Sequence, residues 1–283
     1  MNRYRIAEIL TGIDRRIIYL SILLATIIPF LVGFPQPIYV SKESRDLYNW
    51  VENIRDGSTI LLTFDYYPST LAEVEPMSRA AIKHCWRKDM KLICMTTVPL
   101  GGPSITERVM NDMATNWAVE ELGAKKIYGV DYINLGYKPD YKAVLMGMGT
   151  SFRDIYPTDF RSVPLDSFPI TKNVDKYSDV NFLYIISDNG IVDEWVTIAN
   201  RQFGIPLGAG VTAVMAPKFY SYLQSQQMVG LLGGMRGAAE YEKLIGSEGM
   251  ATLFMGPQSL VHLMIIFFIL LGNTAYFLGG RKV

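Results

Sequence analysis

Residues 59–66, with the sequence TILLTFDY, are the stretch that decides the fold. The run is almost continuously apolar and rich in β-branched and aromatic residues, which predicts a strand covered on both faces. A turn at Pro68-Ser69-Thr70 follows, with Ser69 or Thr70 available as N-cap for a helix over residues 71–88. A second apolar run at residues 91–97 completes the pattern strand, helix, strand. This order predicts two parallel strands joined by a helical crossover.

The same alternation continues through the middle of the chain. We expect further strands at residues 126–133, 143–148, 181–187 and 210–215, and further helices at residues 46–55, 105–122, 193–203 and 226–244. Their short connections predict an α/β fold with a doubly wound, mostly parallel sheet in one domain over residues 41–250. Residues 156–179, rich in Pro, Asp and Ser, form the long irregular connection, and such loops are often lids or partner surfaces.

Two apolar stretches, residues 17–34 and 258–280, flank this domain. Each has about the 20 residues that a helix needs to cross a bilayer, which predicts two transmembrane helices. Residues 33–37 contain no small-x-small cleavage site, so we interpret the first stretch as an uncleaved anchor and not a signal peptide. We therefore expect a cell-membrane protein with two spans.

Basic residues lie at the outer ends of both stretches: Arg3, Arg5, Arg15 and Arg16 before the first, and Arg281 and Lys282 after the second. The positive-inside rule then predicts a cytoplasmic N-terminus at residues 1–16 and a cytoplasmic C-terminus at residues 281–283. The α/β domain is expected to be extracytoplasmic.

The composition argues against several classes of function. Lys plus Arg and Asp plus Glu both number 27, and no basic run is interleaved with aromatic residues, so nucleic-acid binding is not expected. His84 is the one histidine outside the apolar stretches, so a Ser-His triad or a His-rich zinc site has a single possible participant. Cys85 and Cys94 are expected to be free, buried thiols, because a helix and the next strand usually hold their Cα atoms too far apart for a disulfide.

Polar residues follow several of the expected strands, where ligands bind in open α/β sheets. The candidate ligand-binding residues are Asp65, Tyr66, Ser69, Thr97, Gly149, Thr150, Ser151, Asp188 and Asn189. Each is also a residue type that caps helices or makes turns regardless of function. No motif identifies a catalytic residue, so the catalytic group stays unknown.

We expect no cofactor at this site, and the alternative is a bound divalent cation. Asp65 and Asp188 at two strand ends could hold Mg²⁺, because hard cations prefer carboxylate and water ligands. With Ser151 nearby, this arrangement would suit a metal-dependent hydrolase or transferase.

Gly230, Gly233, Gly234 and Gly237 recur at three- and four-residue spacing in the expected helix 226–244. Four helix-interior glycines cost about 4 kcal/mol relative to alanine, so we expect a compensating close approach of a partner helix. The alternative is a loop at Gly233-Gly234 between two shorter helices. Under the helical interpretation this face packs against the sheet, a second copy or another membrane protein, with Glu240 and Glu242 solvated, and we expect the four glycines to form an oligomer interface.

Taken together, these patterns favour a membrane-anchored domain that acts as a non-catalytic scaffold, assembly subunit or ligand- or partner-binding subunit.

Overall fold

The computed structural model describes residue 9, residues 12–32 and residues 37–279. The chain divides into two compact units, one of residues 38–251 and one of residues 1–37 with 252–283. Arg3, Arg5, Arg281 and Lys282, on which the expected orientation depends, lie outside the described residues. Residues 33–36, which bear on cleavage, and residue 280 also lie outside them.

Residues 38–251 form an α/β unit around a single six-stranded parallel sheet in the order β3-β2-β1-β4-β5-β6. The strands are β1 (Thr59–Asp65), β2 (Lys91–Met95), β3 (Tyr132–Asn134), β4 (Phe182–Ser187), β5 (Leu207–Val211) and β6 (Leu231–Gly233). The central strands are buried on both faces, as their continuous apolar sequences predict. The prediction of an α/β fold with a parallel sheet is confirmed.

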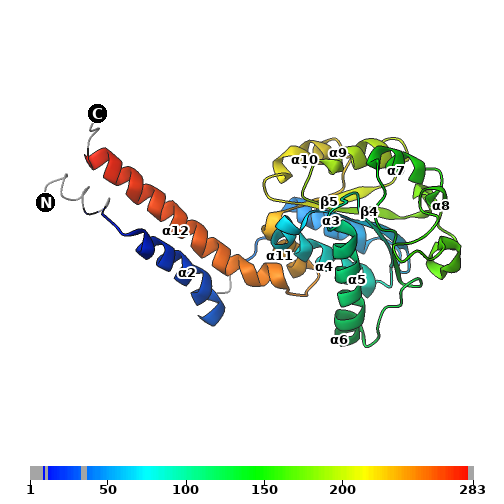
Figure 1. The fold of residues 1–283 in the computed structure, drawn as a ribbon, viewed down its shortest axis with the longest axis horizontal. Coiled ribbons are helices and arrows are strands. Elements are labelled where there is room, and N and C mark those ends of the chain that lie inside the picture. Colours follow the sequence, from blue (N-terminus) through cyan, green and yellow to red (C-terminus); the bar gives the residue numbers. More distant parts are fainter. Residues whose placement is uncertain (1–8, 10–11, 33–36, 280–283) are drawn as a thin grey trace. The chain divides into compact units, whose positions relative to one another are not determined.

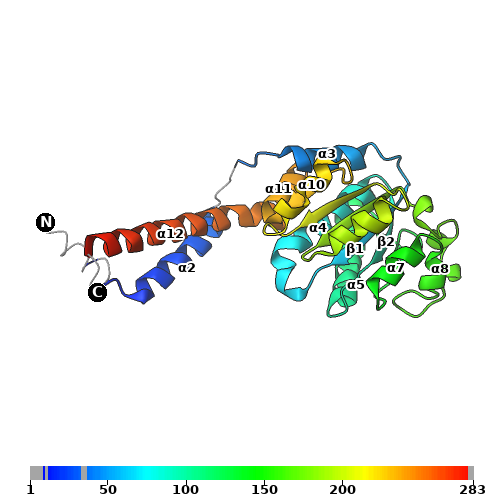
Figure 2. The ribbon, with the colours of Figure 1, turned by 90° about the horizontal axis from the view of Figure 1, so that it is seen from above.

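Helices cover both faces of the sheet. The helices of this unit are α3 (Lys42–Glu52), α4 (Leu71–Arg87), α5 (Gly102–Asp112), α6 (Ala118–Leu122), α7 (Tyr141–Met148), α8 (Phe152–Ile155), α9 (Ile191–Trp195), α10 (Ala216–Gln224) and α11 (Gly234–Leu244). Figure 1 shows α9 and α10 on the opposite side of the sheet from α4 and α5. Helix α8 follows α7 and packs beside it (Figure 2).

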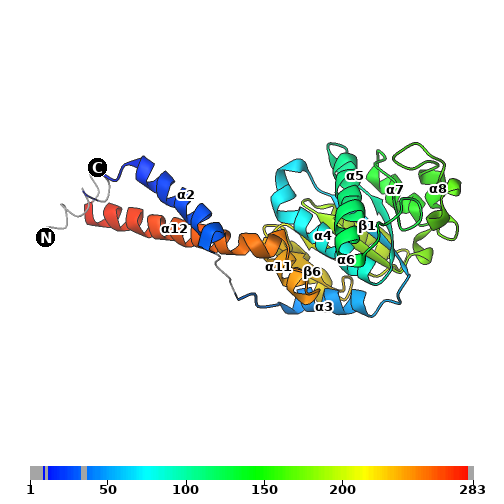
Figure 3. The same cartoon turned by 90° about the horizontal axis from the view of Figure 1, so that it is seen from below.

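Two helices contain a π-helical stretch. Residues Met113–Trp117 connect α5 to α6 in one continuous helical segment, which Gly123 ends with a φ of 75° (Figure 3). Residues Val196–Asn200 extend α9 in the same way. The expected helices at 105–122 and 193–203 therefore exist, each with one local widening.

The expected strand at residues 143–148 is wrong, because these residues belong to α7. The side chain of Asp140 accepts a hydrogen bond from the Ala143 backbone N–H at 3.3 Å and caps the first turn. Val144, Leu145 and Met148 are buried on one face, at helical spacing. A short apolar run fits a strand and a buried helix equally well, and here the cap decides.

The expected continuous helix at residues 226–244 is also wrong in its first half. Residues Leu231–Gly233 are the edge strand β6, and α11 begins at Gly234 with a φ of 62°. The alternative of a loop at Gly233-Gly234 between two shorter helices is also wrong as stated, because strand β6 runs directly into α11 at these two residues.

The glycines of this segment allow close approaches within the chain itself. A Cβ at Gly230 would lie 2.5 Å from the Leu47 backbone nitrogen, and one at Gly237 would lie 2.8 Å from the Leu232 carbonyl carbon. A Cβ at Gly233 or Gly234 would meet Ala216 or Ala213 at 3.0 or 2.7 Å. The packing that suggested a partner helix at these four glycines is therefore supplied by the protein's own residues.

Two strand boundaries differ from expectation. Residues 126–131 form a turn, so the strand expected at 126–133 is reduced to β3, whose pairing with β2 covers three residues. Strand β5 begins three residues before the expected 210–215, because Leu207 and Gly208 already pair with Leu183 and Tyr184.

Glu240 and Glu242 on α11 are buried, with 2% and 3% of their surface exposed, so the expectation that they are solvated is wrong. Glu240 accepts hydrogen bonds from the Ser41 backbone N–H at 3.0 Å and the Ser41 hydroxyl at 2.5 Å. Ser41 is the N-cap of α3. Helix α11 therefore fixes the segment by which the chain enters the α/β unit.

The other unit contains two apolar helices, α2 (Arg15–Val32) and most of α12 (Met250–Gly279). They have 18 and 30 residues and are long and apolar enough to cross a membrane. Within this unit Phe30 and Phe254 make an edge-to-face contact with ring centroids 5.5 Å apart. The prediction of two apolar helices of membrane-spanning length is confirmed.

Candidate functional site

Strands β1 and β4 lie side by side at the centre of the sheet, and the direction of winding reverses between them. The chain proceeds from β1 to β2 on one side and from β4 to β5 on the other. In open parallel sheets, ligands bind at the carboxyl ends of the strands at this reversal. A ligand site is therefore expected at the loops after β1, β2 and β4.

Asp65 ends β1 and is completely buried. One carboxylate oxygen accepts hydrogen bonds from the Thr97 backbone N–H at 2.6 Å and the Thr97 hydroxyl at 2.9 Å. The other oxygen accepts one from the Trp195 indole N–H at 2.9 Å. Asp65 thus connects the end of β1 to the loop after β2 and to α9.

Burial raises the pKa of Asp65 above its usual value, and the hydrogen bonds from Thr97 and Trp195 partly oppose this shift. The three donors are compatible with an ionised carboxylate that accepts from all of them. Asp65 is consequently a structural acceptor at the base of the site, with no free face.

Asp188 and Asn189 follow β4 and bind the loop after β1. Asp188 accepts hydrogen bonds from the Tyr67 backbone N–H at 2.8 Å and the Thr70 hydroxyl at 2.6 Å. The Asn189 amide donates to the Asp65 carbonyl oxygen at 2.9 Å and to the Asp188 carboxylate at 3.1 Å. These bonds join the ends of the two central strands into one rigid rim.

A cavity of about 330 Å³ opens above this rim. Its walls come from the loops after β1, β2 and β4 and from the first turns of α7 and α9: Tyr67, Thr97, Val98, Tyr141, Asn189, Gly190, Ile191 and Glu194. Tyr67 and Tyr141 are 39% and 38% exposed, so each offers part of its ring to a ligand. The volume lies in the range of small-molecule sites.

Four of the residues expected at the site come together at this rim, namely Asp65, Thr97, Asp188 and Asn189. Two others lie elsewhere. Tyr66 points toward α4, where its hydroxyl lies 3.1 Å from the Ser78 hydroxyl in a buried contact. Ser69 is exposed in the short turn Pro68–Thr70. In this turn the hydroxyl that donates a hydrogen bond to Asp188 is that of the neighbouring Thr70.

The expected strand before Gly149, Thr150 and Ser151 is in fact helix α7, so these three residues do not follow a strand. The position of Gly149 is covered by the ring of Phe203. Ser151 caps α8, with its hydroxyl accepting from the Asp154 N–H at 3.1 Å and donating to Asp175 at 3.3 Å. None of the three lines the cavity above Asp65.

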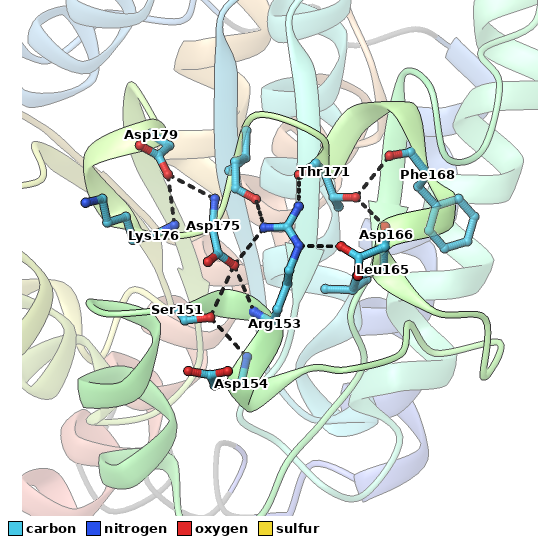
Figure 4. Close-up of polar contacts among 11 residues, drawn as sticks. Ser151, Arg153, Asp154, Leu165, Asp166, Phe168, Thr171, Asp175, Lys176 and Asp179 are labelled. Carbon is cyan, nitrogen blue, oxygen red and sulfur yellow. Dashed lines mark hydrogen bonds and ion pairs between the residues drawn. The ribbon is translucent and has the colours of Figure 1, made fainter.

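Ser151 instead belongs to a polar cluster around Arg153 (Figure 4). The Arg153 guanidinium binds Asp166 at 2.7 Å and Asp175 at 2.8 Å and also donates to the carbonyl oxygens of Thr171 and Val174. These contacts lower the pKa of Asp175, although its partial burial acts in the opposite direction. Arg153 therefore holds together several parts of the long irregular connection at residues 156–179.

The two carboxylates expected to hold Mg²⁺ are both occupied by donors of the chain. The oxygens of Asp65 face N–H and O–H groups, and both oxygens of Asp188 also accept hydrogen bonds. A cation would have to displace these donors, so the arrangement does not fit a magnesium site. Across residues 9, 12–32 and 37–279, no group of three or more His, Cys, Asp or Glu side chains is placed to bind a metal.

His84 lies away from the cavity, in the layer formed by α3, α4 and α11. Its two ring nitrogens lie 2.7 Å from the Tyr241 hydroxyl and 2.8 Å from the Glu52 carboxylate. Burial lowers the pKa of His84, although the neighbouring Glu52 acts in the opposite direction. Cys85 and Cys94 are buried and free, as expected, and burial raises the pKa of the Cys85 thiol to about 12.

Trp195, Tyr141 and Glu194 are among the residues at the site that were not expected from the sequence. Trp195 occupies an apolar position of an amphipathic helix, and its indole N–H reaches a buried carboxylate that lies 130 positions earlier. No local pattern reveals such a contact. Tyr141 could have been anticipated had Asp140 been interpreted as a helix cap.

Comparisons with protein-family models, with curated protein sequences and with solved structures find no match to this chain.

Proposed function

We propose that this protein is a membrane-anchored binding protein whose α/β unit holds a small polar ligand at the carboxyl ends of β1, β2 and β4. The observation that carries the proposal is the bonding of Asp65, Asp188 and Asn189. These side chains fix three loops to one another and leave an open cavity beside them. A site that is rigid before binding loses little conformational entropy when the ligand arrives.

The lining indicates the kind of ligand. Two tyrosine rings supply apolar surface, and Thr97, Asn189 and Glu194 supply hydroxyl, carboxamide and carboxylate groups. Glu194 pairs with Lys142 at 3.3 Å, and the Lys142 side chain is 61% exposed, so the pair can open to a ligand. We expect a small molecule with both a flat apolar part and hydrogen-bonding groups.

The Thr97 hydroxyl of this lining lies beside a carboxylate, but that carboxylate is not free to act as a general base. Thr97 is hydrogen-bonded to Asp65, whose second oxygen is engaged by Trp195. The proposal is accordingly binding and not covalent catalysis.

Native mass spectrometry of the full-length protein released from nanodiscs tests the proposal. The wild type should carry a discrete small-molecule adduct. Gly190→Trp should lose the adduct, because Gly190 lines the cavity with a φ of −76° and the nearest atom to an added Cβ is 3.6 Å away. Val119→Trp, at an exposed position on α6, is the matched control and should keep it. Equal adducts on wild type and Gly190→Trp would contradict the proposed site.

We further propose that α2 and α12 place the α/β unit outside the cytoplasm with both chain ends inside. The basic residues at the outer ends of the two apolar stretches support this orientation. Any self-association is expected through these two helices, since the glycines of residues 230–237 pack within the chain.

A further inference from the structure

A second cavity, of about 640 Å³, opens at the opposite end of the sheet from the Asp65 rim. It lies beside the amino end of β5, between α3 and the loop that follows α10. Six residues give its walls their chemical character: Asn49, Trp50, Asn53, Asn200, Gln226 and Gln227. Five of the six carry carboxamides.

Three of these carboxamides are available to a ligand. Within the described part of the chain, the side-chain amides of Asn49, Asn53 and Gln226 make no hydrogen bond to another protein group, whereas Asn200 donates to the Ile205 carbonyl oxygen at 3.0 Å. A carboxamide has both donor and acceptor atoms, so it can pair with a hydroxyl that also does both. Several free amides around one hollow therefore suit a ligand with several hydroxyls.

Trp50 gives the same cavity an apolar surface. Its side chain is 44% exposed although tryptophan is the largest side chain and is usually well covered. An exposed indole presents a flat apolar face together with an N–H donor. The C–H face of a sugar ring is a ligand surface that matches this combination.

Charge argues against ionic ligands. The lining contains one cation and one anion, Lys42 and Asp46, which pair with each other at 2.6 Å. A phosphate or a nucleic acid would need an excess of basic groups that the cavity does not have. A neutral ligand is therefore favoured.

The backbone at the rim is held in an uncommon conformation. Gln226 has a φ of 58°, in the left-handed region that non-glycine residues rarely adopt. The Gln226 N–H donates to the Leu223 carbonyl oxygen at 3.1 Å, and the Gln227 N–H donates to the Tyr222 carbonyl oxygen at 2.9 Å. These bonds hold the turn so that residue 226 lies on the cavity wall.

We propose that this cavity binds a neutral carbohydrate of about two sugar units, with one ring stacked on Trp50 and its hydroxyls bonded to Asn49, Asn53 and Gln226. The volume lies within the range of small-ligand sites and exceeds that of the cavity above Asp65. The site is separate from the one in the proposed function, so either can fail without the other.

Saturation-transfer NMR on the full-length protein in nanodiscs tests the proposal with four probes: maltose, cellobiose, N,N′-diacetylchitobiose and α-1,6-mannobiose. At least one should give a saturable signal. Trp50→Ala should weaken that binding at least tenfold, because it removes the stacking surface. The substitution should leave the fold intact, since Trp50 is exposed on α3 and alanine favours helices.

Asn53→Ala gives a second variant that does not alter the apolar surface, and it should weaken binding about fivefold. Gly190→Trp, at the other cavity, is the control and should bind as the wild type does. Absence of a saturable signal from all four probes would overturn the proposal. Binding that is unchanged in both Trp50→Ala and Asn53→Ala would overturn it as well.

Discussion

The carboxylate of Glu242 on α11 accepts a hydrogen bond from the backbone N–H of Ala251, in the first turn of α12, at 3.2 Å. It also accepts one from the Gly249 N–H at 3.0 Å. A helix begins with unpaired N–H groups and a partial positive charge, and a carboxylate satisfies both. Glu242 thus fixes the start of the helix by which the chain leaves the α/β unit, as Glu240 fixes Ser41 where the chain enters.

Replacing Glu242 with alanine should loosen the start of α12. A lost helix cap costs about 0.5–2 kcal/mol, which corresponds to roughly tenfold faster amide exchange at the affected turn. Hydrogen exchange measured by mass spectrometry on a peptide covering residues 246–256 checks this. Glu248→Ala, at an exposed neighbouring position, should leave exchange unchanged. Equal exchange in both variants would show that Glu242 does not cap the helix.

Asp65→Asn should destabilise the α/β unit by about 1–3 kcal/mol, the usual cost of an unsatisfied buried polar group. The carboxamide can accept from Thr97 only if its NH₂ group faces the Trp195 indole N–H, which places two donors against each other. Denaturant unfolding measures the loss.

Asp188→Asn is the matched comparison for Asp65→Asn. Asp188 is only partly buried, so water can reach its carboxamide and the loss should be smaller. An equal or larger loss from Asp188→Asn would be inconsistent with Asp65 as the central acceptor of the rim.

Stability should fall as the pH is lowered from about 7.5 to 5.5, and His84 should contribute to the fall. Burial lowers the pKa of His84 in the folded state below the usual histidine value of about 6.5. The unfolded chain therefore takes up the proton first as the pH falls, so the contribution of His84 is fully present above about 6.5 and decreases below it.

Thermal unfolding of the wild type and of His84→Gln across this range isolates the effect. The two proteins should differ in the slope of stability against pH, with the shallower slope in the variant. His262, the other histidine, is in α12 and is present in both proteins. Parallel curves would exclude His84 as the titrating group.

Arg153→Lys should loosen the connection between residues 156 and 179. A lysine has one ammonium group and cannot reproduce the planar set of bonds to Asp166, Asp175 and the two carbonyl oxygens. Limited proteolysis should cut this segment at least fivefold faster in the variant. Arg201→Lys, at an arginine that is exposed, should be cleaved at the wild-type rate.

The parts of the fold that could be predicted are those with a strong local signal. The apolar runs that became β1, β2 and β4 are buried on both faces, and a parallel strand must then be apolar throughout. The residues after these strands could be predicted to meet, because parallel strands end at the same edge. Asp65, Thr97, Asp188 and Asn189 do meet there.

The predictions from sequence that proved wrong concern residues whose local structure or burial is decided by a tertiary contact. The glycines at 230–237 fit a small-residue helix face, but Gly230 accommodates the backbone of Leu47, some 180 positions earlier. The charges of Glu240 and Glu242 suggested a solvated face. Both carboxylates are buried instead, and they accept hydrogen bonds from backbone and hydroxyl donors of Ser41, Gly249 and Ala251. The indole of Trp195 reaches Asp65 by the same kind of long-range contact.

The proposed topology, in which two membrane helices hold the α/β unit outside the cytoplasm, can be tested directly. The native cysteines suit a labelling test, because Cys85 and Cys94 are 2% and 0% exposed. Ser69→Cys introduces an exposed thiol in the α/β unit, and Asp14→Cys introduces one before α2.

Intact cells that express each variant are treated with a membrane-impermeant maleimide, and lysed cells provide the reference for full labelling. We predict that Ser69→Cys is labelled in intact cells, and that Asp14→Cys is labelled only after lysis. The reverse pattern, or labelling of both variants only after lysis, would contradict the account.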